Sequence, residues 1–283
     1  MYLRKPEWLR KQIFDQSKEN DIKKIIKEHN LHTVCSEARC PNLCECFKSG
    51  TATFLLLGSI CTRNCSFCNI SGRGGDLTVD KEEPKRVFEA VKKMNLKFVV
   101  LTMVTRDDLD DGGVSVVIQT VNMIKSYNKN IGVEVLVSDF DGKQNPLNEL
   151  LKTDISVFNH NLETVKSLYT VVRPMASYQR SLELLGFVKQ NRPEIPIKTG
   201  IMVGLGEKKE EVVKLMEDFA NISGDIFTIG QYLQPTRKHY PVKEYIEQEL
   251  YDYYKVEGKK MGIGVIYAGP FVRSSYHAEI LYK

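Results

Sequence analysis

Residues 51–68 read TATFLLLGSICTRNCSFC, and the fold is organised around this stretch. Its first part, 51–57, is a continuous run of apolar and β-branched residues that ends at Gly58, which predicts a buried strand. Three cysteines follow the strand directly, and they are Cys61, Cys65 and Cys68. Gaps this short allow several thiolates to converge on one inorganic group.

Beyond this stretch, strand and helix patterns alternate six times. Further strands are predicted at 98–104, 132–137, 155–158, 195–203, 226–233 and 264–268. Helices are predicted at 84–94, 114–127, 177–191, 208–220 and 243–261. The strands are apolar throughout rather than alternating, so both faces should be buried, as in a parallel sheet with helical crossovers. We therefore predict an α/β fold, a partial (β/α)6 TIM-type barrel with N-terminal and C-terminal extensions.

The domain prediction follows from these patterns. Residues 51–268 form the barrel, residues 1–50 an N-terminal extension with four cysteines, and residues 269–283 a C-terminal segment. The chemistry of such barrels lies at the carboxyl ends of the strands. Polar clusters follow three predicted strands there, at 105–108, 159–161 and 204–207. We expect the site at that end.

Composition limits the partners and the compartment. The net charge of +4 is mild, so it does not argue for nucleic acid, although it suits an acidic protein partner. No signal-peptide pattern follows Met1, and the apolar runs are too short to cross a bilayer. We therefore predict a cytoplasmic protein without a membrane partner. A reducing compartment and an odd count of seven cysteines both argue against disulfides.

The triplet Cys61, Cys65 and Cys68 provides three thiolates within eight residues. Such a set can hold three irons of a [4Fe–4S] cube and leave the fourth iron open. The alternative is a zinc knuckle, or cysteines held by packing alone. Zinc would need a fourth ligand nearby, and the nearest histidines are His29 and His32 upstream.

The triplet spacing, with Phe67 before the last cysteine, resembles the radical S-adenosylmethionine superfamily. The resemblance implies that S-adenosylmethionine chelates the open iron and yields a 5′-deoxyadenosyl radical. The segment GIMVGLGE at 200–207 resembles the element that lies against the adenine. The superfamily's Gly-Gly-Glu motif is absent, and Thr105-Arg106-Asp107 stands in its place. The expected cofactor contacts are Thr105, Glu134, Asn159, Arg173, Lys198, Gly204 and Glu207. For Glu134, Asn159 and Lys198, hydrogen bonding at the edge of the core is the alternative.

The upstream cysteines read Cys35-x4-Cys40-x3-Cys44-x-Cys46, which predicts a second, auxiliary cube. Together with the triplet and the end segment GPFVRSSYHA at 269–278, this spacing resembles the lipoyl synthase family over nearly the whole chain. The resemblance implies auxiliary ligands Cys35, Cys40 and Cys46. It adds a serine oxygen from Arg-Ser-Ser-Tyr, for which Ser275 is the first choice and Ser274 the second. The family usually has glycine where Cys44 stands, so Cys44 competes with Cys46, and we favour Cys46.

The resemblance implies a sulfurtransferase of lipoate biosynthesis. It would insert sulfur at C6 and C8 of an octanoyl-lysine on a lipoyl domain or a glycine-cleavage carrier protein. The auxiliary cluster would donate the sulfur, and a ferredoxin or flavodoxin would supply electrons. We expect no general acid or base, because these carbons are unactivated and the cofactor carries the chemistry. The alternatives are another radical enzyme that inserts sulfur or methylthio groups, and a two-cluster electron carrier.

Overall fold

The computed structural model describes residues 3–9, 24–37, 42, 45–46, 51–70, 75–276 and 278–281. The predicted auxiliary ligand Cys40 lies outside the described residues, as does Cys44, the alternative to Cys46.

The fold is α/β, with eight strands that follow one another in sequence order from β1 to β8. The chain forms two compact units. The N-terminal unit comprises 13–63, 69–158 and 277–283, and the C-terminal unit comprises 1–12, 64–68 and 159–276. The sequential order of parallel strands confirms the predicted partial TIM-type barrel. The predicted boundaries of the barrel, after residue 50 and after residue 268, remain predictions.

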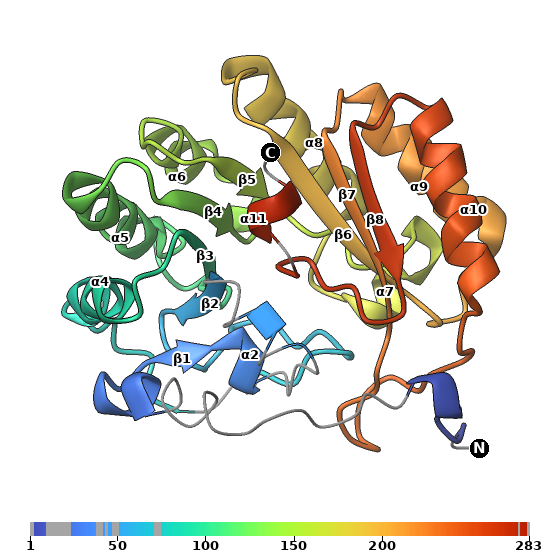
Figure 1. The fold of residues 1–283 in the computed structure, drawn as a ribbon, viewed down its shortest axis with the longest axis horizontal. Coiled ribbons are helices and arrows are strands. Elements are labelled where there is room, and N and C mark those ends of the chain that lie inside the picture. The colour runs from blue at the N-terminus through green and yellow to red at the C-terminus, as the bar shows by residue number, and fades with distance from the viewer. Residues whose placement is uncertain are drawn as a thin grey trace. The chain divides into compact units, whose positions relative to one another are not determined.

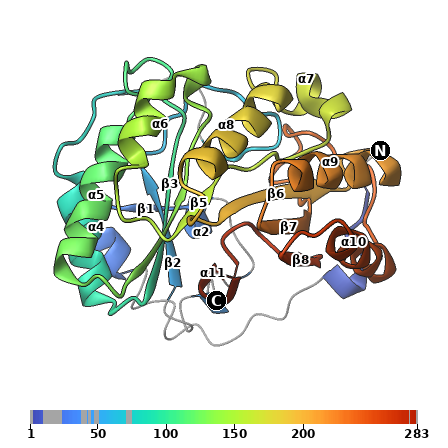
Figure 2. The ribbon, with the colours of Figure 1, turned by 90° about the horizontal axis from the view of Figure 1, so that it is seen from above.

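The N-terminal unit builds its core on three parallel strands. Its strands are β1 (His32–Thr33), β2 (Thr51–Leu56), β3 (Phe98–Met103) and β4 (Gly132–Leu136), and β5 (Val157–Asn159) follows at its end. Its helices are α2 (Val34–Glu37), α4 (Glu83–Lys93), α5 (Val114–Tyr127), η2 (Phe140–Gly142), α6 (Gln144–Leu150) and α11 (Ala278–Leu281). β1 pairs antiparallel with β2, whereas β2, β3 and β4 pair in parallel. Every residue of β2 and β3 is buried, as their apolar runs predict. Figure 2 shows α4, α5 and α6 along one side of these strands.

The C-terminal unit repeats the same arrangement. Its elements are η1 (Glu7–Leu9), η3 (Lys166–Leu168), α7 (Tyr169–Val172), α8 (Tyr178–Asn191), β6 (Ile197–Val203), α9 (Lys209–Asn221), β7 (Ile226–Gln231), α10 (Gln248–Lys260) and β8 (Val265–Gly269). β6, β7 and β8 pair in parallel, and α9 and α10 lie to one side of them (Figure 1). Among the described residues, no helix combines the length and the apolar character needed to cross a bilayer.

Two helix predictions need correction. The last predicted helix, α10, begins at Gln248 and not at residue 243, because the preceding backbone bonds to other elements. The Lys243 amide donates to the Gly204 carbonyl (2.9 Å), and the Ile246 amide donates to the Gln231 side chain (2.8 Å). The short helix α6 was not predicted, since seven residues give a weak helical period.

Candidate functional site

The turn that leads into the cysteine triplet is held from α4. Leu57 and Gly58 both have positive φ angles, 67° and 75°, so the chain turns sharply where β2 ends. The Glu83 carboxylate accepts the amide hydrogens of Leu57 (2.7 Å) and Gly58 (3.4 Å). Burial raises the pKa of Glu83, although these two hydrogen bonds act in the opposite direction. α4 thereby fixes the exit from the first barrel strand.

The three cysteines of the triplet are half-buried. No three Cys, His, Asp or Glu side chains in the described part of the chain gather closely enough to hold a single metal ion. A [4Fe–4S] cube takes one thiolate per iron, so its ligands stand farther apart than those of one ion. The thiolate donors and their spacing therefore fit a cluster better than a closed zinc site.

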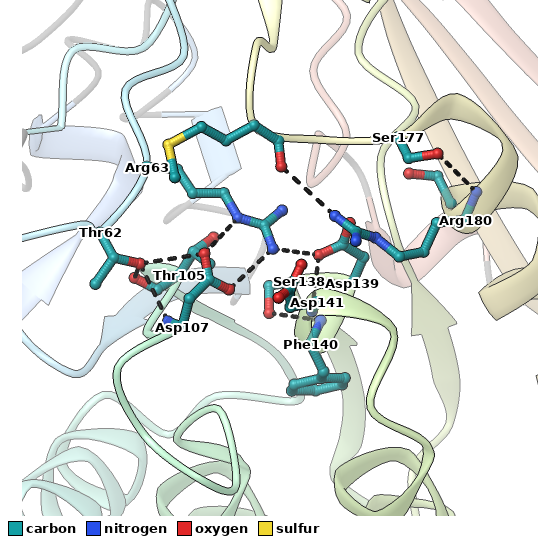
Figure 3. A network of polar contacts seen from close by, with 12 residues as sticks. Thr62, Arg63, Thr105, Asp107, Ser138, Asp139, Phe140, Asp141, Ser177 and Arg180 are labelled. Carbon is teal, nitrogen blue, oxygen red and sulfur yellow. Dashed lines mark hydrogen bonds and ion pairs between the residues drawn. The ribbon is translucent and has the colours of Figure 1, made fainter.

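The first half of the triplet loop is tied to the loops that follow β3 and β4 (Figure 3). The Thr62 amide and hydroxyl both donate to the Thr105 carbonyl, at 2.9 and 3.0 Å. The Arg63 guanidinium donates to both carboxylate oxygens of Asp107, at 2.8 and 2.9 Å, and to Asp139 at 2.5 Å. Burial lowers the pKa of Arg63, but the bonds to Asp107 and Asp139 outweigh it, so the pKa lies above its ordinary value. The guanidinium is permanently charged.

The second half of the loop belongs to the C-terminal unit and is held there by backbone contacts. The Ser66 amide donates to the Val172 carbonyl (3.0 Å), and the Ser66 carbonyl accepts the Tyr240 amide (2.8 Å). The Nε2 atom of His239 lies 3.0 Å from the Cys68 carbonyl. These contacts give the loop a fixed backbone without using any cysteine sulfur.

The GIMVGLGE segment forms a turn that its own glutamate closes. The Glu207 carboxylate accepts the amide hydrogens of Gly204 (2.6 Å) and Leu205 (2.9 Å). Burial raises the pKa of Glu207, and these bonds oppose the rise. Leu205 is fully buried, and Phe67 of the triplet loop packs against the cluster that contains it. The turn and the triplet loop therefore support each other.

Arg173 holds the segment that follows β5. Its Nη1 atom donates to the carbonyl oxygens of Asn161 (2.9 Å) and Leu162 (3.3 Å) and to the Tyr169 hydroxyl (3.2 Å). Only 9% of Arg173 is exposed. The residue fixes backbone at the carboxyl end of a barrel strand, where such folds place their sites.

Asn161 and Glu163 lie in that segment. The Asn161 amide nitrogen donates to a Glu163 carboxylate oxygen at 3.0 Å. The Asn161 side-chain oxygen is buried and accepts no hydrogen bond from any described residue. Burial raises the pKa of Glu163, while Arg173 and Asn161 lower it. Glu163 also has a positive φ of 65°, a strained conformation that is common at functional sites. A ligand hydroxyl would satisfy the orphaned oxygen.

A hydrogen bond within the N-terminal unit links the segment of the upstream cysteines to the residue after the triplet. Cys35, on α2, and Cys46 are both buried. The side-chain amide nitrogen of Asn69 donates to the Glu37 carbonyl at the end of α2 (2.7 Å). Asn69 follows Cys68 directly, so this bond ties α2 to the residue after the triplet.

The C-terminal segment packs on two strands of its unit at glycine positions. A Cβ atom on Gly230 of β7 would lie 2.0 Å from the Val272 carbonyl oxygen, which no side chain could tolerate. A Cβ atom on Gly200 of β6 would lie 3.4 Å from the Ser274 Cβ atom. Ser274 and Ser275 are both half-buried. Gly230 therefore makes room for the backbone just before the Arg-Ser-Ser-Tyr segment, whereas Ser274 lies at ordinary contact distance from the Gly200 position.

Comparison with known proteins accounts for both cysteine sets. The model of the radical SAM superfamily matches residues 55–219. A lipoyl synthase of Alkaliphilus metalliredigens is 47% identical over 275 residues, which cover 97% of this chain and 94% of the relative. A lipoyl synthase of Caldicellulosiruptor bescii is 45% identical over 98% of this chain and 95% of the relative. The chain belongs to the lipoyl synthase family. It is thus a radical SAM sulfurtransferase, with S-adenosylmethionine and two [4Fe–4S] clusters as cofactors.

Solved structures agree with the fold of this lipoyl synthase family member. Streptococcus suis SuiB bound to its precursor peptide has a TM-score of 0.61 at 12% identity and covers 95% of this chain and 58% of its own. Methylornithine synthase (PylB) has a TM-score of 0.56 at 14% identity and covers 88% of this chain and 81% of its own. These similarities support the α/β barrel architecture alone.

Three other predicted cofactor contacts of the lipoyl synthase site are buried, and they lie at different positions along their strands. Asn159 ends β5, Glu134 lies in the middle of β4, and Lys198 is the second residue of β6, at the end away from Gly204. Each is at most 1% exposed. Thr105 lies just past β3, where its carbonyl holds the triplet loop. Contact of any of these residues with the cofactor remains a prediction.

Sequence reasoning about the lipoyl synthase site placed Asn161 in the polar cluster 159–161 but did not choose it as a cofactor contact, and it missed Glu163. It chose Asn159 from the same segment, since Asn159 ends the strand. Their position could have identified them, because Asn161 and Glu163 also follow the carboxyl end of β5, where barrel folds place their sites. His239 was also missed, because it lies 171 positions from Cys68, whose carbonyl it contacts.

Proposed function

We propose that this chain inserts two sulfur atoms, at C6 and C8, into an octanoyl group carried on a protein lysine, which forms the lipoyl group. The observation that carries the proposal is the pair of cysteine sets together with the Arg-Ser-Ser-Tyr segment, in a chain that matches lipoyl synthases over nearly its full length. When bound, S-adenosylmethionine and the triplet cluster supply hydrogen abstraction from unactivated carbon, and the auxiliary cluster supplies sulfur.

For the cluster ligands, we propose the cysteines and the serine that the motifs select. Cys61, Cys65 and Cys68 hold the radical-forming cluster; Cys35, Cys40, Cys46 and Ser275 hold the auxiliary cluster. The five described cysteines are buried or half-buried, which supports this assignment because a protein-bound cluster is shielded from solvent. A serine oxygen is a harder and weaker ligand to iron than a thiolate, so it can leave when the cluster gives up sulfur.

The carboxyl end of β5 and the turn after β6 provide the proposed polar contacts to S-adenosylmethionine. The orphaned side-chain oxygen of Asn161 would accept a hydrogen bond from a cofactor hydroxyl, and Glu163 lies within hydrogen-bond reach of Asn161. Gly204 and Glu207 form the turn that resembles the adenine element. Arg173 positions Asn161 by donating a hydrogen bond to the Asn161 carbonyl oxygen. These residues bind and orient, and none of them acts as a general acid or base.

The substrate protein carries a lipoyl domain, as membership of the family implies. We further propose a glycine-cleavage carrier protein as an alternative substrate and a ferredoxin or flavodoxin as the electron donor. Thiolates that bind clusters must stay reduced, which supports a cytoplasmic location. We also propose that residues 1–50 and 269–283 complete the auxiliary site around the barrel of residues 51–268.

Anaerobic turnover on an octanoyl-lysyl peptide tests the proposal. The purified protein, reconstituted with iron and sulfide, is given a reductant and S-adenosylmethionine, and the peptide is followed by mass spectrometry. We expect a mass gain of two sulfur atoms, because the dithiol stays reduced under these conditions, together with 5′-deoxyadenosine. Formation of 5′-deoxyadenosine without sulfur in the peptide would indicate another radical enzyme, and absence of both would favour an electron carrier.

A further inference from the structure

One buried ion-pair network joins the triplet loop to the ends of two further strands (Figure 3). Arg63 stands in the loop after β2, Asp107 in the loop after β3 and Asp139 in the loop after β4. The side chains of Arg63 and Asp139 are 4% and 0% exposed, and that of Asp107 is 23% exposed. Charges removed from water in this way are retained only when they are paired and hydrogen-bonded.

The geometry of the network constrains the loop strongly. The two bonds from Arg63 to Asp107 form a planar fork, which fixes the orientation of the guanidinium as well as its position. The third bond, to Asp139, prevents the fork from turning. Next to it, the Thr62 hydroxyl accepts the Asp107 amide hydrogen at 3.1 Å and donates to the Thr105 carbonyl. Two consecutive loop residues are therefore fixed to the same neighbouring loop.

The fixed backbone leads directly to a cluster ligand. The Arg63 amide donates to the Cys61 sulfur at 3.4 Å. Hydrogen bonds to sulfur stabilise the reduced and more negative form of an iron–sulfur cluster, and so raise its reduction potential. Any rotation of the 62–63 peptide would lengthen this bond.

We propose that Arg63, clamped by Asp107 and Asp139, is a positioning residue that orients Cys61 and keeps the amide-to-sulfur hydrogen bond in place, thereby setting the reduction potential of the radical-forming cluster. The proposal rests on the proposed function in one respect, that the triplet binds a cluster. Arg63 touches neither substrate nor cofactor and acts through the loop backbone.

Arg63→Lys tests this role, because lysine keeps the charge but cannot form the fork. The readouts are iron per chain, the melting temperature of the protein, and the midpoint potential of the cluster whose electron paramagnetic resonance signal changes on addition of S-adenosylmethionine. We expect a midpoint shifted to lower potential and a partial loss of triplet iron, while iron at the auxiliary cluster is retained. If Arg63→Lys does not fold, Thr62→Val, which removes one hydroxyl from the network, should give the same shift to a smaller extent.

The matched control is Arg86→Lys, an arginine of the same unit whose partners are Asp80 and the His29 carbonyl. Its midpoint should equal that of the unaltered protein. A folded Arg63→Lys protein with unchanged midpoint and full triplet iron overturns the proposal, as does an equal shift in the control. If the unaltered protein binds no cluster at the triplet, the proposed function fails instead, so the two failures are distinguishable.

Discussion

Cys44 and Cys46 lie only two positions apart, and either could serve as the third cysteine ligand of the auxiliary cluster. Cys46 is buried and keeps the Cys35-x4-Cys40-x5-Cys46 spacing. We expect Cys46→Ala to lose about half of the protein-bound iron, because one of two cubes loses a thiolate. Cys44→Ala should keep all of it. Iron analysis of anaerobic protein decides between them, and the reverse pattern would assign the ligand to Cys44.

A second residue-scale prediction concerns Gly230. The alanine methyl group in Gly230→Ala would meet the Val272 carbonyl oxygen, so the backbone of the C-terminal segment must shift. Overpacking of this kind costs about 1–3 kcal/mol of unfolding free energy. We also expect loss of auxiliary-cluster iron, with triplet iron retained, measured by urea unfolding and iron analysis.

The control for Gly230 is Gly186→Ala on α8. Its added methyl group would lie 3.5 Å from Ile222, an ordinary packing distance, and alanine favours a helix by about 0.5–1 kcal/mol over glycine. This variant should keep its iron and its stability. Full auxiliary iron in Gly230→Ala would show that the segment does not depend on this close approach.

At the scale of elements, α4 and β2 are joined through one buried carboxyl group. Glu83 accepts the amide hydrogens that end β2, and burial raises its pKa above the ordinary value of 4.5. The folded state therefore holds the Glu83 proton more tightly than the unfolded state. The stabilising contribution is complete below the ordinary pKa and is lost as pH rises through the raised, folded-state pKa.

The prediction is that the free energy of unfolding falls with rising pH over this acidic range, and that Glu83→Gln makes the fall smaller. Urea unfolding of the cluster-free protein at several pH values, from about pH 4 upward, measures the slope. Glu89→Gln, on the exposed face of the same helix, should leave the slope unchanged. An identical slope in Glu83→Gln and the unaltered protein would contradict the assignment.

At the scale of the whole molecule, the chain carries a net charge of +4, which suits an acidic carrier domain. We expect added salt to reduce turnover of the octanoylated carrier protein a few-fold, since salt screens the attraction between exposed charges. Turnover of the free octanoyl-lysyl peptide should change much less. Equal salt dependence of the two substrates, measured side by side by mass spectrometry, would rule out electrostatic docking.

Most of the barrel could be predicted, since each strand is an apolar run whose burial depends on its own residues. α5 (Val114–Tyr127) and α8 (Tyr178–Asn191) follow the predicted bounds closely. The start of α10 could not be predicted, because the amides of Lys243 and Ile246 bond to the Gly204 carbonyl and the Gln231 side chain, which lie far away in sequence.

The sequence by itself determined the cysteine spacings, the strand before the triplet and the family, because each of the motifs that carry them is a short run of neighbouring residues. Only the tertiary structure brought Arg63 to Asp107 and Asp139, which lie 44 and 76 positions further along. It also buried the Asn161 oxygen without a partner among the described residues. The physical reason is that parallel strands gather the loops at their carboxyl ends, and pairings between those loops depend on strand order, which no local pattern contains.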